Sequence, residues 1–390
     1  MKLSFSGVIF FIIILSFLGG YFQFVDRSIY YLTSFSSIVL ILLSIVFGIR
    51  NHKGMKWTHL IVFCSIMVLQ IIQILLHGNV FLSNAFYIFA TLLFLLFTKI
   101  KVSHLQFMNI FNISYLIYLS LSIGVFMEII PLNRDLNLFE LDLLDLNVKT
   151  FIGFYGSTAA IDAYSAICVV LNIVFYEARA RARLLIIVAA LSAMILTFRS
   201  SPYLVLIAPI ICIYFTRLVS HKISIPILNT IIFGSFCIPL IFHQIFDNDQ
   251  LDLIINIGTT GRAQLWNEIL ELFGDAKLND QLLGFGNTDS FEVFVWNDYH
   301  SNPHNSYFRV LLENGLIIYV ISWITLTFMM IHLPNKKLIV IYAILISGIS
   351  NTNVFTFMNL PVVFLLIYYM NDKETVKVFS KNVKQPLSSA

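Results

Sequence analysis

The chain has 390 residues, of which 58% are hydrophobic and 12% are charged, and its formal net charge is +3. A soluble protein carries roughly 25% charged residues, so this composition excludes a water-soluble globular domain and predicts a protein that lies in lipid. The four cysteines all lie inside apolar runs, which argues against disulfides and against a thiol site.

Apolar stretches long enough, or nearly long enough, to cross a bilayer recur along the chain. A transmembrane helix needs about 20 apolar residues. In chain order the candidate spans are 5–24, 29–49, 58–76, 80–98, 105–130, 158–176, 184–198, 203–216, 225–246, 316–331, 338–349 and 354–370. The stretches that begin at 184, 203 and 338 are short. The sequence therefore predicts an all-α polytopic membrane protein with about twelve transmembrane helices.

The distribution of Lys and Arg among the connections predicts the orientation of these spans. When the N-terminus is placed in the cytoplasm, most of the 24 basic residues fall in cytoplasmic segments, as the excess of Lys and Arg in cytoplasmic loops of membrane proteins predicts. Both termini are then cytoplasmic. We expect a single transmembrane domain over 1–370 and a cytoplasmic tail at 371–390. Long periplasmic loops are expected at 131–157 and 247–305, the second between the ninth and tenth spans and containing short helices.

Arg199 stands between two of the short apolar runs, in the sequence Thr197-Phe198-Arg199-Ser200. As a helix, residues 184–198 would rise about 22 Å at about 1.5 Å per residue, which is less than the bilayer core. Arg199 is therefore expected within membrane depth, where an arginine costs roughly 2.5–3.5 kcal/mol and should have a partner. Either it reaches the outer headgroups, or it forms an anion site in a cavity, which we favour.

Arg262 follows Gly261 and begins a predicted helix that Thr259 or Thr260 can cap. An arginine in the first turn opposes the helix dipole. Its position is better explained if an anion joins it, because free backbone N–H groups and a guanidinium together bind phosphate. The alternative is an ion pair with Glu268 or another outer carboxylate. The helix would place one apolar side over the outer membrane face or over a cavity, formed by Leu265, Trp266, Ile269, Leu270 and Phe273.

His304 opens a short predicted helix over 305–314, which Gly315 is expected to end. A helix N-terminus disfavours the protonated imidazole, so His304 would be neutral and able to accept a proton. The alternative is a histidine that only makes a hydrogen bond at the helix cap. His300 is interpreted as incidental. Gly284-Phe285-Gly286 is interpreted as a turn, since no predicted strand precedes it as in a nucleotide-binding loop.

These outer residues resemble the bacterial O-antigen ligase and O-antigen polymerase superfamily, whose members are polytopic inner-membrane glycosyltransferases. The resemblance consists of an Arg-Ser step between two short spans, a Gly-Arg before a Trp-bearing helix and a Gly-x-Gly, and a His-Asn that ends the large outer loop. The matching positions are Arg199-Ser200, Gly261-Arg262, Trp266, Gly284, Gly286, His304-Asn305 and Gly315. Ser201-Pro202 departs from the pattern, because relatives often have a small residue there, and it leaves the local backbone open.

The resemblance implies an inverting, metal-independent and cofactor-free sugar transfer at the periplasmic face of the inner membrane. Arg199 and Arg262 would hold the donor diphosphate and stabilise the leaving group, and His304 would take a proton from the acceptor hydroxyl. Further substrate contacts are expected at Trp266, Asn305, Tyr307 and Arg309. For Trp266 and Tyr307, sugar stacking competes with the role of an ordinary interface aromatic.

Within this superfamily a polymerase extends a lipid-linked glycan, whereas a ligase transfers the finished glycan to lipid A-core. We favour the polymerase, because the Gly-Arg-x-x-x-Trp form at 261–266 and the aromatic- and Asn-rich composition look more like polymerases. A lipid-linked oligosaccharide transporter or flippase is the alternative from another class. The expected partners are an undecaprenyl-diphosphate-linked oligosaccharide, membrane lipids and a protein that regulates chain length. No nucleic acid is expected.

Overall fold

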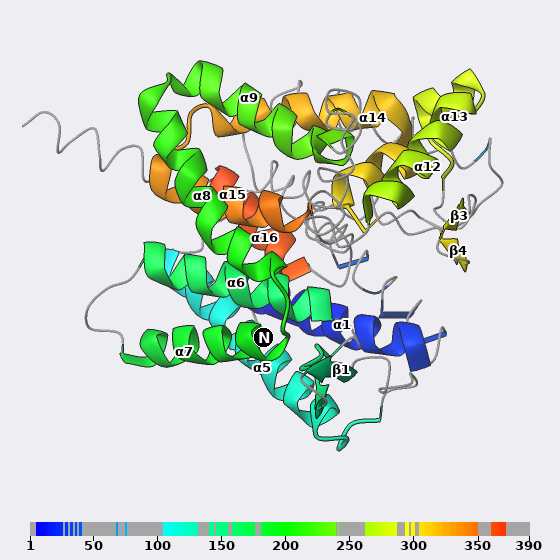
Figure 1. Ribbon diagram of the computed structural model, residues 1–390. Coiled ribbons are helices and arrows are strands. Elements are labelled where there is room, and N and C mark those ends of the chain that lie inside the picture. The colour runs from blue at the N-terminus through cyan, green and yellow to red at the C-terminus, as the bar shows by residue number, and fades with distance from the viewer. Residues whose placement is uncertain are drawn as a thin grey trace, which may run out of the picture.

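Figure 1 shows the computed structural model of the chain, in which helices form a bundle and two short hairpins lie in the connections. The structure describes residues 5–25, 104–131, 140–143, 146–154, 158–175, 181–238, 262–286, 293–295, 298–300, 304–349 and 360–371, together with isolated positions between 28 and 75 and position 241. The predicted span 80–98, most of the spans 29–49 and 58–76, and the tail after residue 371 lie outside the described residues, as do the expected caps Thr259 and Thr260.

The described part of the chain is predominantly helical, as the sequence predicts. Its helices are α1 (Phe5–Val25), α5 (His104–Phe126), α6 (Thr158–Val174), α7 (Arg181–Leu196), α8 (Ser201–Leu218), α9 (His221–Phe233), the 3-10 helix η2 (Gly234–Cys237), α12 (Arg262–Asp275), α13 (Leu278–Leu283), α14 (Ser306–Met330), α15 (Asn335–Ser347) and α16 (Leu360–Asn371). Within the described residues, α5, α8 and α14 are each long and apolar enough to cross a membrane. The chain thus has the helices of a membrane protein.

The short apolar runs at 184–198 and 203–216 correspond to α7 and α8, so a helix does form on each side of Arg199. The short helix predicted at 305–314 and the span predicted at 316–331 are continuous in α14. Within this one element the backbone is kinked at Gly315, whose φ of 73° and ψ of 175° lie outside helical values. The helix stop expected at Gly315 is therefore confirmed as a break within α14.

Two antiparallel hairpins add strands that the sequence analysis did not predict. In the first, β1 (Glu140–Leu143) pairs with β2 (Leu146–Lys149), and in the second, β3 (Val293–Val295) pairs with β4 (Asp298–His300). Both lie in the segments expected as long outer loops. The first hairpin has a recognisable signal, because apolar and polar residues alternate along each of its strands as in a half-buried sheet.

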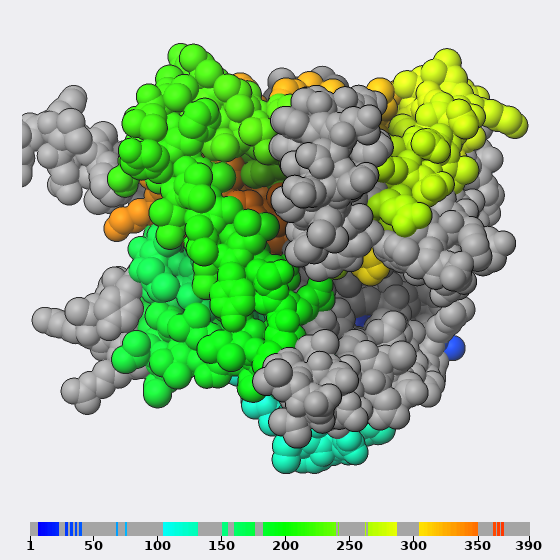
Figure 2. Space-filling view, viewed as in Figure 1, coloured from blue at the N-terminus to red at the C-terminus, as the bar shows by residue number. Residues whose placement is uncertain are grey.

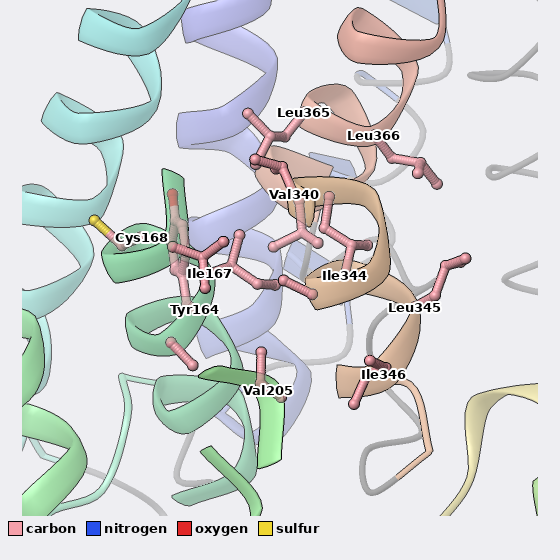
Figure 3. Close-up of a cluster of buried hydrophobic side chains, with 14 of the residues drawn as sticks. Tyr164, Ile167, Cys168, Val205, Val340, Ile344, Leu345, Ile346, Leu365 and Leu366 are labelled. Atoms are coloured by element: carbon pink, nitrogen blue, oxygen red, sulfur yellow. The ribbon is translucent and has the colours of Figure 1, made fainter. Parts of the chain in front are cut away.

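The core of the bundle is built around α15, which packs against α6, α8 and α16. From Val340 to Ile346 every residue of α15 is at most 3% exposed. A helix that is apolar on all sides is buried on all sides, which explains why this short helix takes the central place. Figure 3 shows Val340 and Ile344 of α15 among Ile167 of α6, Val205 of α8 and Leu365 of α16.

The outer surface of the bundle is apolar as well. In Figure 2 the helices α7, α8 and α9 occupy much of the visible face. Exposed large apolar side chains on α8 are Leu204, Ile207, Ile210, Ile211 and Tyr214. A soluble protein rarely exposes so many apolar side chains along one helix, because their contact with water is unfavourable. Contact of the same side chains with lipid carries no such penalty.

Hydrogen bonds between buried side chains join neighbouring helices. The amides of Asn112 on α5 and Asn172 on α6 donate to each other's oxygens at 3.0 and 2.9 Å. Asn229 on α9 donates to the hydroxyl of Thr327 on α14 at 2.9 Å. In lipid, where apolar contact alone distinguishes helix partners poorly, such pairs fix which helices meet.

Candidate functional site

Arg199 lies in the tight connection between the end of α7 at Leu196 and the start of α8 at Ser201. The connection is held to the rest of the chain by the Phe151 N–H, which donates to the Leu196 carbonyl at 2.9 Å. Pro202 lies in the first turn of α8, where its missing N–H is tolerated. Ser201-Pro202 therefore starts a helix directly after the arginine.

The guanidinium of Arg199 is paired with a carboxylate from α6. Its Nε lies 3.4 Å from Oδ2 of Asp162, and the two side chains are 26% and 3% exposed. The hydroxyl of Thr197 donates a short hydrogen bond to Oδ1 of Asp162. Asp162 is thus the offsetting partner that the position of Arg199 requires. Sequence reasoning did not name it, although an acidic residue inside an apolar span is itself a signal of a functional or paired site.

Arg262 is the first residue of α12, so the helix start predicted at this residue is confirmed. The guanidinium is half-buried, and its burial lowers its pKa to about 10, with the nearby positive charge of Arg199 as a second cause. Arg262 remains protonated at neutral pH. The charge of Arg199 thus acts on Arg262, although the two arginines come from distant parts of the sequence.

The apolar face predicted for α12 is buried against the rest of the protein. Leu265, Trp266 and Ile269 belong to the core, and Leu270 and Phe273 pack against it. The helix contacts η2 and β3, and in Figure 1 it lies with α13 and the second hairpin at the right of the bundle. The indole of Trp266 is buried, and its contact with a sugar stays a prediction.

The start of α14 combines an exposed histidine with a buried asparagine. His304 is exposed and has a left-handed backbone with a φ of 50°. Asn305 is fully buried and caps α14, because its Oδ1 accepts the N–H groups of Tyr307 and Phe308 at 2.9 and 3.1 Å. Its Nδ2 donates to Ser235 in η2 at 3.1 Å. These bonds fix the backbone directly behind His304, and a substrate contact of Asn305 stays a prediction.

The 3-10 helix η2 contacts both α12, which begins at Arg262, and α14, which follows His304. The contact between α14 and η2 includes the hydrogen bond from Asn305 to Ser235. One element thus contacts both helices that carry predicted catalytic residues. Sequence spacing gave no sign of this arrangement.

The Gly-x-Gly turn at 284–286 has a specific structural role that its sequence alone did not reveal. Phe285 and Gly286 donate their N–H groups to the carbonyls of Leu312 and Glu313 at 2.8 and 3.1 Å, which satisfies the end of the first part of α14. Gly284 and Gly315 lie back to back, so that a Cβ on Gly315 would be 2.4 Å from the Gly284 nitrogen. The spacing of these motifs therefore reflects direct backbone contact.

Tyr307 and Arg309 both have protein partners in this structure. The Tyr307 hydroxyl donates to the Leu345 carbonyl at 2.5 Å, and its ring packs on Phe233 with centroids 4.6 Å apart. Arg309 pairs through Nε with Oε1 of Glu313 at 2.8 Å, one turn along the same helix. Their proposed contacts with sugar and phosphate stay predictions.

The structure thus pairs Arg199 with Asp162, lets the charge of Arg199 act on Arg262, and places His304 on the surface at the start of α14. Within the described ranges, no group of three or more His, Cys, Asp and Glu side chains could hold a metal ion. Comparison of the chain with models of protein families, with curated proteins and with solved structures gives no match.

Proposed function

We propose that this chain is a bacterial inner-membrane glycosyltransferase that polymerises O-antigen or a related surface polysaccharide at the periplasmic face. The observation that carries the proposal is the ion pair of Arg199 with the buried Asp162 at the α7–α8 connection, together with the effect of the Arg199 charge on the half-buried Arg262. Two like charges repel more strongly as water is removed. Asp162 offsets part of this positive charge, and a polyanion such as a diphosphate suits a site with two guanidinium groups.

The proposed reaction is a single displacement at the anomeric carbon of the growing glycan. A hydroxyl of the lipid-linked repeat unit attacks this carbon and forms the new glycosidic C–O bond. The bond from the same carbon to the phosphate oxygen breaks, and undecaprenyl diphosphate leaves with the bonding electrons. The acceptor proton passes to the imidazole of His304. Attack opposite the leaving group inverts the configuration.

The arginines serve the leaving group in this scheme. Guanidinium groups bind phosphate oxygens through paired N–H donors, and they stabilise the charge that develops as the diphosphate departs. Two arginines supply this stabilisation without a metal ion. His304 suits the proton transfer, because it is exposed at the start of α14 and its neighbour Asn305 fixes the backbone behind it. The donor and acceptor are undecaprenyl-diphosphate-linked oligosaccharides, and a chain-length regulator is the proposed protein partner.

Deletion of the gene in the source bacterium, followed by gel analysis of glycolipids, tests the proposal. Loss of a polymerase should leave lipid A-core capped with a single repeat unit. The wild-type gene on a plasmid should restore long chains, and an Arg262→Ala variant present at the same membrane level should not.

Other patterns from the same deletion would contradict the proposal in identifiable ways. Uncapped core with accumulated long lipid-linked glycan would indicate a ligase. Lipid-linked single units trapped on the cytoplasmic side would indicate a flippase. An unchanged profile of lipopolysaccharide, capsule and exopolysaccharide would remove surface glycans from consideration.

A further inference from the structure

We propose that Asp162 is a positioning residue, which orients the guanidinium of Arg199 toward the diphosphate while lowering the positive charge of the site. The inference rests on the proposed function. It concerns a residue on α6, a helix that contributes none of the predicted site residues. The Asp162 side chain is buried, at 3% exposed, and its carboxylate contacts Arg199 in the α7–α8 connection.

The contacts of Asp162 define a specific geometry. Oδ2 lies 3.4 Å from Nε of Arg199, and Oδ1 accepts from the Thr197 hydroxyl. Thr197 belongs to the same short connection as Arg199, so one carboxylate engages two residues that are two positions apart. The carboxylate is thereby oriented by the threonine, and it in turn orients the arginine.

The shape of the guanidinium allows an ion pair at Nε to limit the position of the rest of the group. It is a rigid plane with its donors at fixed angles. Nε of Arg199 and Oδ2 of Asp162 form an ion pair at 3.4 Å without the alignment of a hydrogen bond, so the contact restricts where the two Nη groups can lie. A guanidinium held in this way can meet a phosphate with paired donors, whereas an unrestrained arginine would act as a diffuse positive charge.

The same carboxylate also opposes the binding of an anion. It is a negative charge beside Arg199, and it repels a diphosphate that approaches this arginine. Its loss therefore has two opposite consequences. Removing the negative charge should favour binding, and releasing Arg199 from its orientation should slow the reaction. A residue that only stabilised the fold would produce neither effect in the folded enzyme.

The test uses the full-length protein in detergent and in proteoliposomes, with Asp162→Asn as the main variant. The side chain keeps its size and loses its charge. We expect the rate of glycan extension per folded molecule to fall by about tenfold or more. The dissociation constant for undecaprenyl diphosphate, measured without glycan, should stay within threefold of the wild type or become tighter. Equal loss of rate and affinity, or a rate within twofold of the wild type, would overturn the inference.

A double-mutant cycle with Arg199→Lys shows whether Asp162 acts through Arg199. Lysine is a point charge that cannot present paired donors. In the wild-type background we expect Arg199→Lys to weaken binding of undecaprenyl diphosphate. In the Asp162→Asn background it should weaken binding much less, because the arginine there has already lost its orientation. Additive effects would show that the two residues act independently and would overturn the inference.

Two further variants guard against misfolding as an explanation. Thr197→Val keeps the ion pair and removes the hydrogen bond that orients the carboxylate, so it should lower the rate in the same direction by less. Asn172→Ala is the matched control, because it removes a buried polar contact on α6 about 15 Å from Asp162 at about 1.5 Å per residue. It should lower thermal stability and leave the rate per folded molecule unchanged.

Failure of the proposed function can be distinguished from failure of this inference. If the wild type binds undecaprenyl diphosphate but extends no glycan, the polymerase proposal fails, and the binding cycle alone decides the role of Asp162. If the wild type does not bind undecaprenyl diphosphate, the site is not a diphosphate site and the inference is overturned as well.

Discussion

At the residue scale, His304 holds a backbone conformation that few side chains adopt. Its φ of 50° is left-handed, a region in which histidine, asparagine and aspartate are enriched over other residues with a Cβ. Substitution by alanine therefore changes both the chemistry and the backbone preference. Asparagine removes the imidazole and tolerates the same backbone, which makes it the more informative replacement.

We expect His304→Asn to abolish glycan extension while the protein remains at its normal level in the membrane, because the variant lacks the imidazole that is proposed to accept the proton from the acceptor hydroxyl. Chain length on glycolipid gels measures the effect, and immunoblotting measures the protein. His300→Ala, in the nearby hairpin, is the control and should support normal chains. Long chains from His304→Asn would rule out the histidine as the base.

Asn305 allows a structural role to be separated from a substrate contact. Asn305→Asp keeps the oxygen that caps α14 and loses the donor to Ser235, whereas Asn305→Ala loses both. Loss of a cap costs about 0.5–2 kcal/mol, so we expect thermal stability to decrease from wild type to Asp to Ala. Equal stability of all three proteins would show that the capping bonds of Asn305 contribute nothing to the free energy of unfolding.

The unequal success of sequence reasoning at this scale has a physical cause. Arg199, Arg262 and His304 attract attention because a cation in lipid or a charge at a helix start is unfavourable without a partner. Asp162 was missed because its partner lies on another helix, and neither periodicity nor local spacing shows which helices pack together.

At the scale of elements, the contact between Gly284 and Gly315 joins the outer helix α13 to the break in α14. Both glycines have positive φ values, of 81° and 73°. A Cβ on Gly284 would lie 2.5 Å from backbone atoms of Glu313 and Gly315, and one on Gly315 would lie 2.3 Å from the Leu282 carbonyl oxygen. Backbone atoms cannot move aside as the end of a side chain can.

We therefore expect Gly284→Ala and Gly315→Ala to destabilise the protein strongly. The left-handed backbone alone costs about 1–2 kcal/mol for a residue with a Cβ, and the overlaps add to that cost. Thermal unfolding in detergent should show a clearly lower midpoint for both variants.

Gly274→Ala is the control for these two substitutions, because no atom lies within 4 Å of the Cβ position at this helical glycine. Alanine is favoured over glycine in a helix by roughly 0.5–1 kcal/mol, so stability should be the same or slightly higher. A midpoint as low in this variant as in the other two would contradict the packing argument.

The helix boundaries near the site were predictable because local chemistry determines them. Gly315 ends a helical segment, Asn305 precedes one, and Arg262 begins one. The hairpins were missed because the apolar content of the chain drew attention to helix-length stretches. The alternation over 140–149 spans only a few residues on each strand, and the role of the Gly-x-Gly turn depends on a segment far along the sequence.

At the scale of the whole molecule, the proposed mechanism neutralises the diphosphate with arginine side chains. We expect glycan extension by the purified protein in proteoliposomes to be unaffected by EDTA. The proteoliposome assay matters, because chelators disturb the outer membrane of whole cells. Loss of activity in EDTA that a divalent cation restores would contradict a metal-independent transfer.

The membrane character of the chain was predictable from composition alone, and α5, α8 and α14 agree with it. The arrangement of the helices was not. The sequences of α15 and α8 are both mostly apolar. Composition alone therefore cannot distinguish a helix in the centre of the bundle from one at its surface. Burial separates them, because α15 is enclosed by α6, α8 and α16.

The central position of α15 constrains how the protein is made. Its 13 residues rise about 20 Å at about 1.5 Å each, against a hydrocarbon core of about 30 Å. So short a segment is poorly retained by lipid when it leaves the translocon alone. Its apolar side chains are instead buried by contacts with α6, α8 and α16. Stable insertion of α15 therefore depends on the neighbouring helices that bury it, and not on lipid alone.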